Sequence, residues 1–165
     1  MADITYSMTA TERKSGATLV PGKGEAGSLK MLVCSVQEVP ASASGSTIFF
    51  GRIPSNARIS NLSRVYWDDL STTGSPTLDI GLASVDANVT SDPDAFSAGH
   101  DVTSADTSGE PMLDLFEASG DYAWDFVNGQ TTDPGGALDV YGSIVDAATA
   151  GLTGTVMVEV YGYLD

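Results

Sequence analysis

Short apolar runs broken by turn-forming residues are the feature that most constrains how this chain can fold. Along its 165 residues, runs rich in Val, Ile, Leu and aromatic side chains alternate with segments rich in Gly, Pro, Ser and Asn. The turn signals recur about every ten residues, a spacing typical of β-sandwiches and barrels. The clearest run, residues 77–83, places Leu78, Ile80 and Leu82 on one face and polar or small residues on the other. The pattern predicts an all-β domain.

The individual runs predict about eight strands. Residues 92–96 begin with Asp-Pro and predict one helical turn instead. The apolar phase slips between Ile59 and Leu62, which predicts a bulge or a strand buried on both faces. The last two strands are expected to form a hairpin or to be neighbours. The fold class that follows is an antiparallel two-sheet β-sandwich, of jelly-roll type if the long middle section crosses between the sheets. The expected strands cover residues 29–36, 47–53, 58–67, 77–83, 113–116, 122–126, 138–144 and 155–163.

The first part of the chain differs from the rest in composition. Residues 1–28 hold four glycines, several Ser and Thr, and few apolar residues. They predict an extended N-terminal arm or a loosely docked segment, whereas residues 29–165 form the sandwich domain. An ordinary edge strand and loop of the same domain is the alternative for residues 1–28.

Charge is distributed very unevenly along the chain. No Lys or Arg follows Arg64, and the formal net charge is −15. A phosphate backbone is bound by clustered Lys and Arg, so this charge argues against nucleic acid as a partner and equally against an anionic membrane. The basic residues are therefore the candidates for contact with a protein partner: Arg13, Lys14, Lys23, Lys30, Arg52, Arg58 and Arg64.

Nothing in the sequence indicates insertion into a membrane or export. No stretch approaches the roughly 20 apolar residues of a membrane span. The start, Met1-Ala2-Asp3-Ile4, lacks the charged residues and apolar block of a signal peptide. We therefore expect a soluble protein made in the cytoplasm.

The residue types that carry catalysis are scarce. His100 is the single histidine, and no Gly-x-Ser-x-Gly elbow is present. We expect His100 to be a solvated loop residue, with no catalytic site and no cofactor. Cys34 is the single cysteine and has apolar neighbours, which predicts a buried thiol acting as a small hydrophobe. One His and one Cys cannot make an ordinary zinc site, so no metal site is assigned.

Carboxylates leave two further alternatives open. A calcium ion could be held by the oxygen-bearing side chains of Asp86, Asn88, Asp92 and Asp94, although their spacing does not match an EF-hand. Paired carboxylates for glycoside hydrolysis could come from Asp68 with Asp69, or from Asp121 with Asp125. In a chain this acidic, such groupings also arise by chance.

Aromatic residues allow a carbohydrate-binding alternative. A sugar-stacking platform would use exposed members of the set Trp67, Tyr122, Trp124 and Tyr141. The corresponding function is a carbohydrate- or receptor-binding β-sandwich module.

Five short sequence segments follow one another along the chain. A β run ends in Ile-Pro-Ser-Asn-Ala-Arg-Ile, and Trp-Asp-Asp-Leu then precedes Leu-Asp-Ile-Gly-Leu. Asp-Pro-Asp-Ala-Phe follows, and the last segment is Gly-Thr-Val-Met-Val-Glu-Val-Tyr-Gly-Tyr. These segments occupy residues 53–59, 67–70, 78–82, 92–96 and 154–163. In this order they resemble the small auxiliary capsid proteins of tailed bacteriophages, the decoration, cement or head-fibre class, and the resemblance covers roughly residues 46–165. In such a phage, the carbohydrate- or receptor-binding alternative would belong to a tail or surface structure.

The resemblance implies a non-enzymatic β-sandwich that binds the outer face of an assembled shell of major capsid protein, often as a homotrimer. The expected location is thus the virion surface, after synthesis in the host cytoplasm. The class has no fixed site, so no functional residue is carried over. The arm, with Arg13, Lys14 and Lys23, could lie across acidic patches on the shell or on a neighbouring copy.

Overall fold

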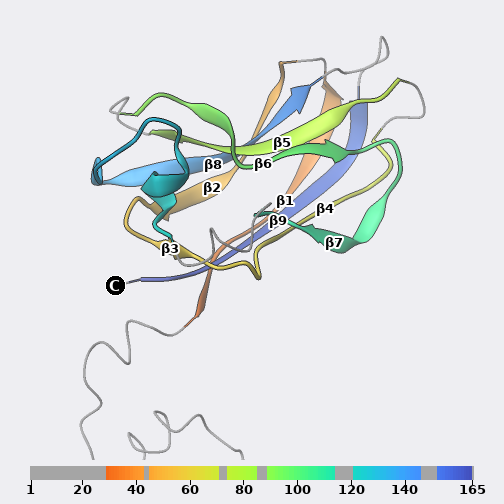
Figure 1. The fold of residues 1–165 in the computed structure, drawn as a ribbon. Helices are drawn as coiled ribbons and strands as arrows, with labels where there is room; N and C mark the ends of the chain where they lie inside the picture. The colour runs from red at the N-terminus through yellow and green to blue at the C-terminus, as the bar shows by residue number, and fades with distance from the viewer. Residues whose placement is uncertain are drawn as a thin grey trace, which may run out of the picture.

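The computed structural model describes residues 29–42, 45–70, 74–84, 89–113, 121–145 and 152–164. These residues form two antiparallel sheets packed face to face (Figure 1). The predicted arm, residues 1–28, lies outside the described residues. No helix in the described ranges is both long and apolar enough to cross a membrane.

Nine strands make up the two sheets. The five-stranded sheet has the order β1-β9-β4-β7, with β3 also paired to β9, and the four-stranded sheet has the order β2-β8-β5-β6. The strands are β1 (Lys30–Ser42), β2 (Thr47–Pro54), β3 (Arg58–Ile59), β4 (Arg64–Trp67), β5 (Thr77–Ser84), β6 (Asp92–Asp101), β7 (Asp106–Pro111), β8 (Ala137–Val145) and β9 (Leu152–Tyr163).

The strand pairs are nested. The first strand pairs with the last, β1 with β9, and the second with the one before the last, β2 with β8. Further in, β4 pairs with β7 and β5 with β6. The chain therefore passes repeatedly from one sheet to the other, and residues far apart in sequence become neighbours in each sheet. The predicted antiparallel two-sheet sandwich is confirmed.

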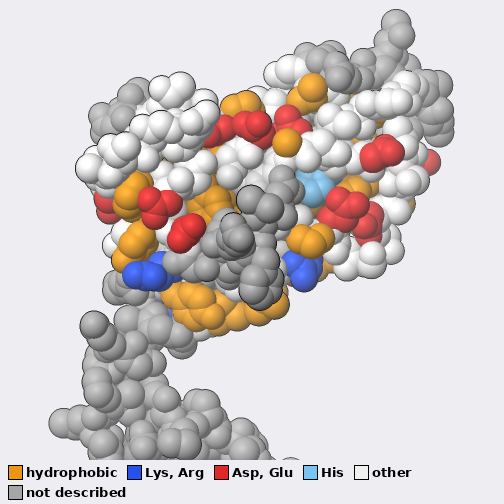
Figure 2. Space-filling view, in the orientation of Figure 1, with side chains coloured by type: hydrophobic (Ala, Val, Ile, Leu, Met, Phe, Trp, Pro, Cys, Tyr) orange, Lys and Arg blue, Asp and Glu red, His pale blue; other side chains and the backbone are white. Residues whose placement is uncertain are grey.

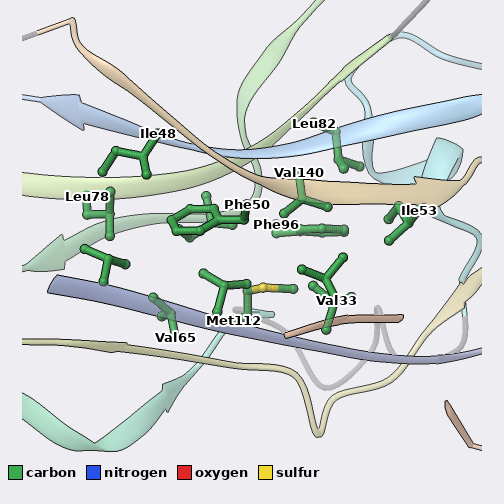
Figure 3. Close-up of a cluster of buried hydrophobic side chains, with 14 of the residues drawn as sticks. Val33, Ile48, Phe50, Ile53, Val65, Leu78, Leu82, Phe96, Met112 and Val140 are labelled. Atoms are coloured by element: carbon green, nitrogen blue, oxygen red, sulfur yellow. The ribbon is translucent and has the colours of Figure 1, made fainter. Parts of the chain in front are cut away.

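The core fills the space between the sheets. Alternation puts Leu78, Ile80 and Leu82 of β5 inside, and the same period buries every second residue of β8, and of β9 from Val156 onward. Figure 3 shows Ile48, Phe50 and Leu78 of the four-stranded sheet facing Val65 and Met112 across the interior. Burial of apolar surface on this scale is the main term that stabilises the fold.

The phase slip in residues 58–67 has a simple origin. Two strands, β3 and β4, are separated by a turn at residues 60–63, in which Ser63 N donates to the Ser60 carbonyl at 3.0 Å. Both strands pair with the same partner, β9. The turn, rather than a bulge, resets the alternation.

Three local expectations were wrong. Residues 92–96 are the start of β6 and not a helical turn, because pairing with β5 outweighs the Asp-Pro cap signal. Residues 123–126 are a 3-10 helix, η2 (Ala123–Phe126), rather than a strand. The strands β8 and β9 are in different sheets, so they are neither a hairpin nor paired neighbours. Of the predicted strand 113–116, only residue 113 lies within the described ranges.

Candidate partner-binding surface

The predicted contact residues do not form one cluster. Lys30, Arg58 and Arg64 lie on β1, β3 and β4 of the five-stranded sheet, whereas Arg52 lies on β2 of the other sheet. The remaining three, Arg13, Lys14 and Lys23, lie outside the described residues. No single basic surface therefore follows from the four described positions.

Two of these arginines are held by side chains within the domain. Arg52 Nε lies 2.6 Å from Asp139 Oδ1 on the paired strand β8, in a solvent-exposed ion pair. Such pairs contribute about 0–1 kcal/mol. Arg58 donates to the Tyr122 hydroxyl at 2.9 Å and its guanidinium stands 4.5 Å from the centre of that ring. Arg58 thereby links β3 to the residue that precedes η2.

Arg64 has a local structural role as well. Its Nη1 donates to the carbonyls of Asn61 and Ser63 at 2.9 and 3.1 Å. These carbonyls belong to the turn between β3 and β4, so the guanidinium fixes that turn. On the sheet, Arg64 stands opposite Glu159 of β9.

The outer face of the five-stranded sheet carries an apolar groove. Val36, Tyr66 and Met157 are consecutive across β1, β9 and β4, since Val36 pairs with Met157 and Met157 with Tyr66. The groove that they line is bordered by Asp68, Asp106, Thr107, Thr155 and Glu159. In the sequence, the signal for this face is the alternation of residues 155–163, which puts Met157 and Tyr161 on the side of β9 opposite the buried valines.

A hydrogen-bonded carboxylate occupies the middle of this face. The Tyr66 hydroxyl donates to Glu159 Oε2 at 3.0 Å, and the Tyr161 hydroxyl approaches the same oxygen at 3.5 Å. The pKa of Tyr66 is raised, mainly by burial and then by its hydrogen bond to Glu159. Both tyrosines therefore remain neutral donors at physiological pH.

His100 is not the solvated loop residue that we expected. It lies on β6, is only 5% exposed, and packs its ring against Trp67 with centroids 5.4 Å apart. Its Nε2 lies 2.7 Å from Ser97 Oγ, and its Nδ1 lies 2.7 Å from Glu110 Oε2 on β7. Because β6 and β7 belong to different sheets, His100 joins the two layers at one edge of the sandwich.

Ser97, His100 and Glu110 are hydrogen-bonded in the order serine, histidine, carboxylate, as in a catalytic triad. Their geometry nevertheless fits a structural role. Ser97 is 1% exposed, so its hydroxyl has no route to a substrate carbonyl. Neither Ser97 nor His100 lines either of the described surface hollows. The three groups satisfy one another's hydrogen-bonding needs within the protein.

Two aspartates close the turn between β6 and β7. Asp101 Oδ1 accepts the Thr103 hydroxyl at 2.7 Å and the Thr103 N–H at 3.0 Å. Asp106 Oδ1 likewise accepts the Ser108 hydroxyl at 2.7 Å and the Ser108 N–H at 2.8 Å. These bonds favour the ionised carboxylates and lower the pKa of both groups, the side-chain hydroxyl being the larger cause in each.

The lowered pKa values predict a loss of stability in acid. The folded state binds these protons less readily than the unfolded chain, so the carboxylates contribute stability above the unfolded pKa of about 3.9. That contribution disappears as the pH falls through the folded pKa. Urea unfolding of the wild type and Asp106→Asn should therefore differ at pH 6, and the difference should shrink below pH of about 3. A difference that stays constant with pH would contradict this assignment.

The calcium alternative gains no support from the described residues. Asp92 and Asp94 lie on β6, and Asp92 Oδ2 accepts the Asn128 N–H at 2.6 Å. Asp86 and Asn88 lie outside the described ranges. Within those ranges, no three His, Cys, Asp or Glu side chains come together as a metal site would require. The pKa of Asp94 is raised, first by a hydrogen bond with Asp92 and then by burial.

The four aromatic residues of the sugar-platform alternative do not form a common surface. Trp67 is buried in the core, where its indole N–H donates to the Ser104 carbonyl at 2.8 Å. Tyr141 lies on β8 of the other sheet. Tyr122 and Trp124 stack on each other, with ring centroids 6.2 Å apart and planes 11° from parallel. These four residues therefore do not form a flat platform for a sugar ring.

Cys34 is exposed, which corrects the expectation of a buried thiol. It lies on β1, opposite Glu159, and therefore belongs to the outer face of the five-stranded sheet. The apolar neighbours on which the expectation rested point in both directions, since Val33 is buried and Val36 is exposed.

Comparison with known proteins gives one informative likeness. No family model matches the chain, and no curated protein matches it either. Among solved structures, a chain of the "Cyanophage Pam1 capsid asymmetric unit" superposes with a TM-score of 0.61. The two chains are 20% identical, and the match covers 99% of this chain and 100% of that one. The protein therefore shares its fold with a component of a phage capsid asymmetric unit, which agrees with the class that its sequence resembles.

Proposed function

We propose that this protein is a virion structural component of a tailed phage, and specifically a decoration or cement protein. In this role it binds the outer surface of the assembled capsid through contacts with the major capsid protein, as a homotrimer, and stabilises the shell. The observation that carries the proposal is the full-length likeness to a chain of a phage capsid asymmetric unit. The sequence resemblance to auxiliary capsid proteins supports the same role independently of the fold.

The strand order supports a jelly-roll form of the sandwich. Eight of the nine strands form four nested pairs, in which the first and last strands of the chain enclose the next pair. This pattern arises when one long hairpin wraps around itself. Jelly rolls are common among viral capsid domains. The architecture is thus one that viral shells already use.

The burial of Ser97 and His100 supports a role without catalysis. Both side chains of this triad-like grouping are closed to substrate, although Glu110 is partly exposed. Attachment to a shell requires a stable scaffold, and the two packed sheets with their common core supply one. Residues 1–28, with Arg13, Lys14 and Lys23, supply the proposed arm that reaches the shell or a neighbouring copy.

Binding to assembled capsids tests the proposal. Purified protein mixed with mature capsids stripped of auxiliary proteins should co-sediment with them and raise the temperature at which they release DNA. Binding adds to shell stability because the surface involved exists only on the assembled lattice. Protein that stays in the supernatant with capsids of its own phage, at micromolar concentration, would refute the proposed function.

A further inference from the structure

The outer face of the five-stranded sheet differs in composition from an ordinary solvated sheet face. Reading across β1, β9 and β4, Met31 stands opposite Tyr161, and Val36 opposite Met157 and then Tyr66. Met31 and Val36 are 48% and 59% exposed, although both are large apolar side chains. Figure 2 shows hydrophobic side chains gathered along the lower border of the molecule, between two patches of Lys and Arg.

The types of residue on this face match those of interface cores. Tyr, Met and Arg are enriched where two proteins meet, while Lys, Glu and Asp are depleted. Here Tyr66, Tyr161, Met31, Met157 and Arg64 are grouped on three adjoining strands. A water-facing strand would instead place polar side chains at most of these positions.

The outer faces of the two sheets differ in charge. In the middle of the apolar face, the Glu159 carboxylate is hydrogen-bonded by Tyr66 and stands opposite Arg64 on the sheet, and Asp68 and Asp106 lie at the border of the groove. The outer face of the four-stranded sheet carries Asp79, Asp92, Asp94 and Asp139 on its strands, and Arg52 is paired with Asp139. Burial, followed by the charges of Asp92 and Asp94, raises the pKa of Tyr141 on that face.

This difference in charge indicates which kind of partner the apolar face can bind. Two copies of a chain with net charge −15 repel each other, so they can associate only where charge is balanced and apolar area is available. The outer face of the five-stranded sheet comes nearest to meeting both conditions, because three of the four basic residues in the described ranges, Lys30, Arg58 and Arg64, lie on strands of that sheet, and Met31 and Val36 are exposed there. The acidic face of the other sheet does not, and is suited instead to a partner that carries positive charge.

We propose that the outer face of the five-stranded sheet, centred on Val36, Met157 and Tyr66, is the surface through which one copy of this chain binds a second copy. The proposal deepens the homo-oligomer part of the proposed function, but the contact itself requires no capsid. The edge position of β1 assists it, because an edge strand leaves one flank open to a neighbour.

A matched pair of substitutions tests the proposal. Val36→Glu places a charge on the proposed contact, and Phe49→Glu does the same at a similarly exposed apolar residue (53%) on β2 of the other sheet. Analytical ultracentrifugation of the full chain should show an oligomer for the wild type and for Phe49→Glu. For Val36→Glu, the dissociation constant should rise about 100-fold. Because both side chains are exposed, both variants should keep the wild-type circular dichroism spectrum.

Cys34 gives a second readout that does not depend on a substitution. Its thiol is exposed on the proposed contact face of the single chain, so assembly should slow its reaction with a maleimide as protein concentration rises. Specific protein complexes have dissociation constants far below about 100 μM. A wild type that is monomeric at that concentration would therefore overturn the proposal. An oligomer that survives Val36→Glu with Cys34 still fully reactive would also overturn it. Self-association without capsid binding would instead refute the proposed function and leave this contact standing.

Discussion

Replacing His100 with alanine is expected to lower the free energy of unfolding by about 3–4 kcal/mol. His100 makes two hydrogen bonds of 2.7 Å, one within β6 to Ser97 and one to Glu110 on β7 of the other sheet. The alanine variant loses both bonds. It leaves the buried Ser97 hydroxyl without its partner and opens a cavity beside Trp67. Each of these effects costs free energy, and they act at the same edge of the sandwich.

The direction of the hydrogen bonds follows from the chemistry of the partners. A carboxylate oxygen accepts, so Nδ1 of His100 donates to Glu110, while the Ser97 hydroxyl, which can donate or accept, pairs with Nε2. Glu110→Gln is the matched control, because its amide oxygen can still accept from Nδ1 at a partly exposed position. We expect that variant to lose about 1 kcal/mol or less. Urea unfolding followed by circular dichroism measures both variants; a loss below about 1 kcal/mol for His100→Ala would contradict the cross-sheet role.

Replacing Gly81 with alanine is expected to prevent folding or to cost more than about 4 kcal/mol. A Cβ at this position would lie 2.1 Å from the Asp92 carbonyl oxygen and 2.4 Å from the Pro93 carbonyl carbon. Both atoms are backbone atoms of β6, so neither can move aside as a side-chain end could. Relief of the collision would require β5 and β6 to separate.

Gly129→Ala is the control for the general cost of losing a glycine. Gly129 has a φ of +82°, which alanine adopts only with strain, but the space around it is open. We expect a loss of about 1–2 kcal/mol there, from backbone strain alone. Thermal melts and soluble yield compare the two variants. A Gly81→Ala protein that folds with the stability of Gly129→Ala would show that the close approach of β6 to β5 is not needed for the fold.

Regular alternation made much of the fold predictable. Residues 77–83, 138–144 and 155–163 alternate strictly because each strand has one face on the core and one outside, and all three were predicted as strands. The same rule could not detect β7, whose sequence Asp-Thr-Ser-Gly-Glu-Pro contains no large apolar residue and whose residues are all exposed or half-buried. An edge strand held by backbone bonds to β4 leaves no periodic signal.

The other wrong predictions concern features that depend on contacts between residues distant in sequence. Asp92-Pro93 is a helix-start signal locally, yet pairing with β5 makes it a strand. His100 has polar neighbours in sequence, and only the closing of the two sheets over it brings Glu110 and Trp67 into contact. The nested pairing also sends β8 and β9 to different sheets, although they follow each other along the chain.

The candidate surface was predictable only in part. The sequence predicted the basic residues as contacts with a protein partner, but Arg58 is hydrogen-bonded to Tyr122 and Arg64 to turn carbonyls. The apolar face instead depends on the register of β1, β9 and β4, which aligns Val36, Met157 and Tyr66. No local pattern in the sequence specifies that alignment.

A protein inventory of purified virions decides whether this protein is part of a phage particle. No Lys or Arg follows Arg64, so trypsin leaves residues 65–165 as one long peptide, and the digest must use a protease that cleaves at Asp or Glu. We expect peptides from this chain in gradient-purified particles, in a fixed ratio to the major capsid protein. Absence of the chain from intact particles, in a digest that detects the other structural proteins, would contradict it.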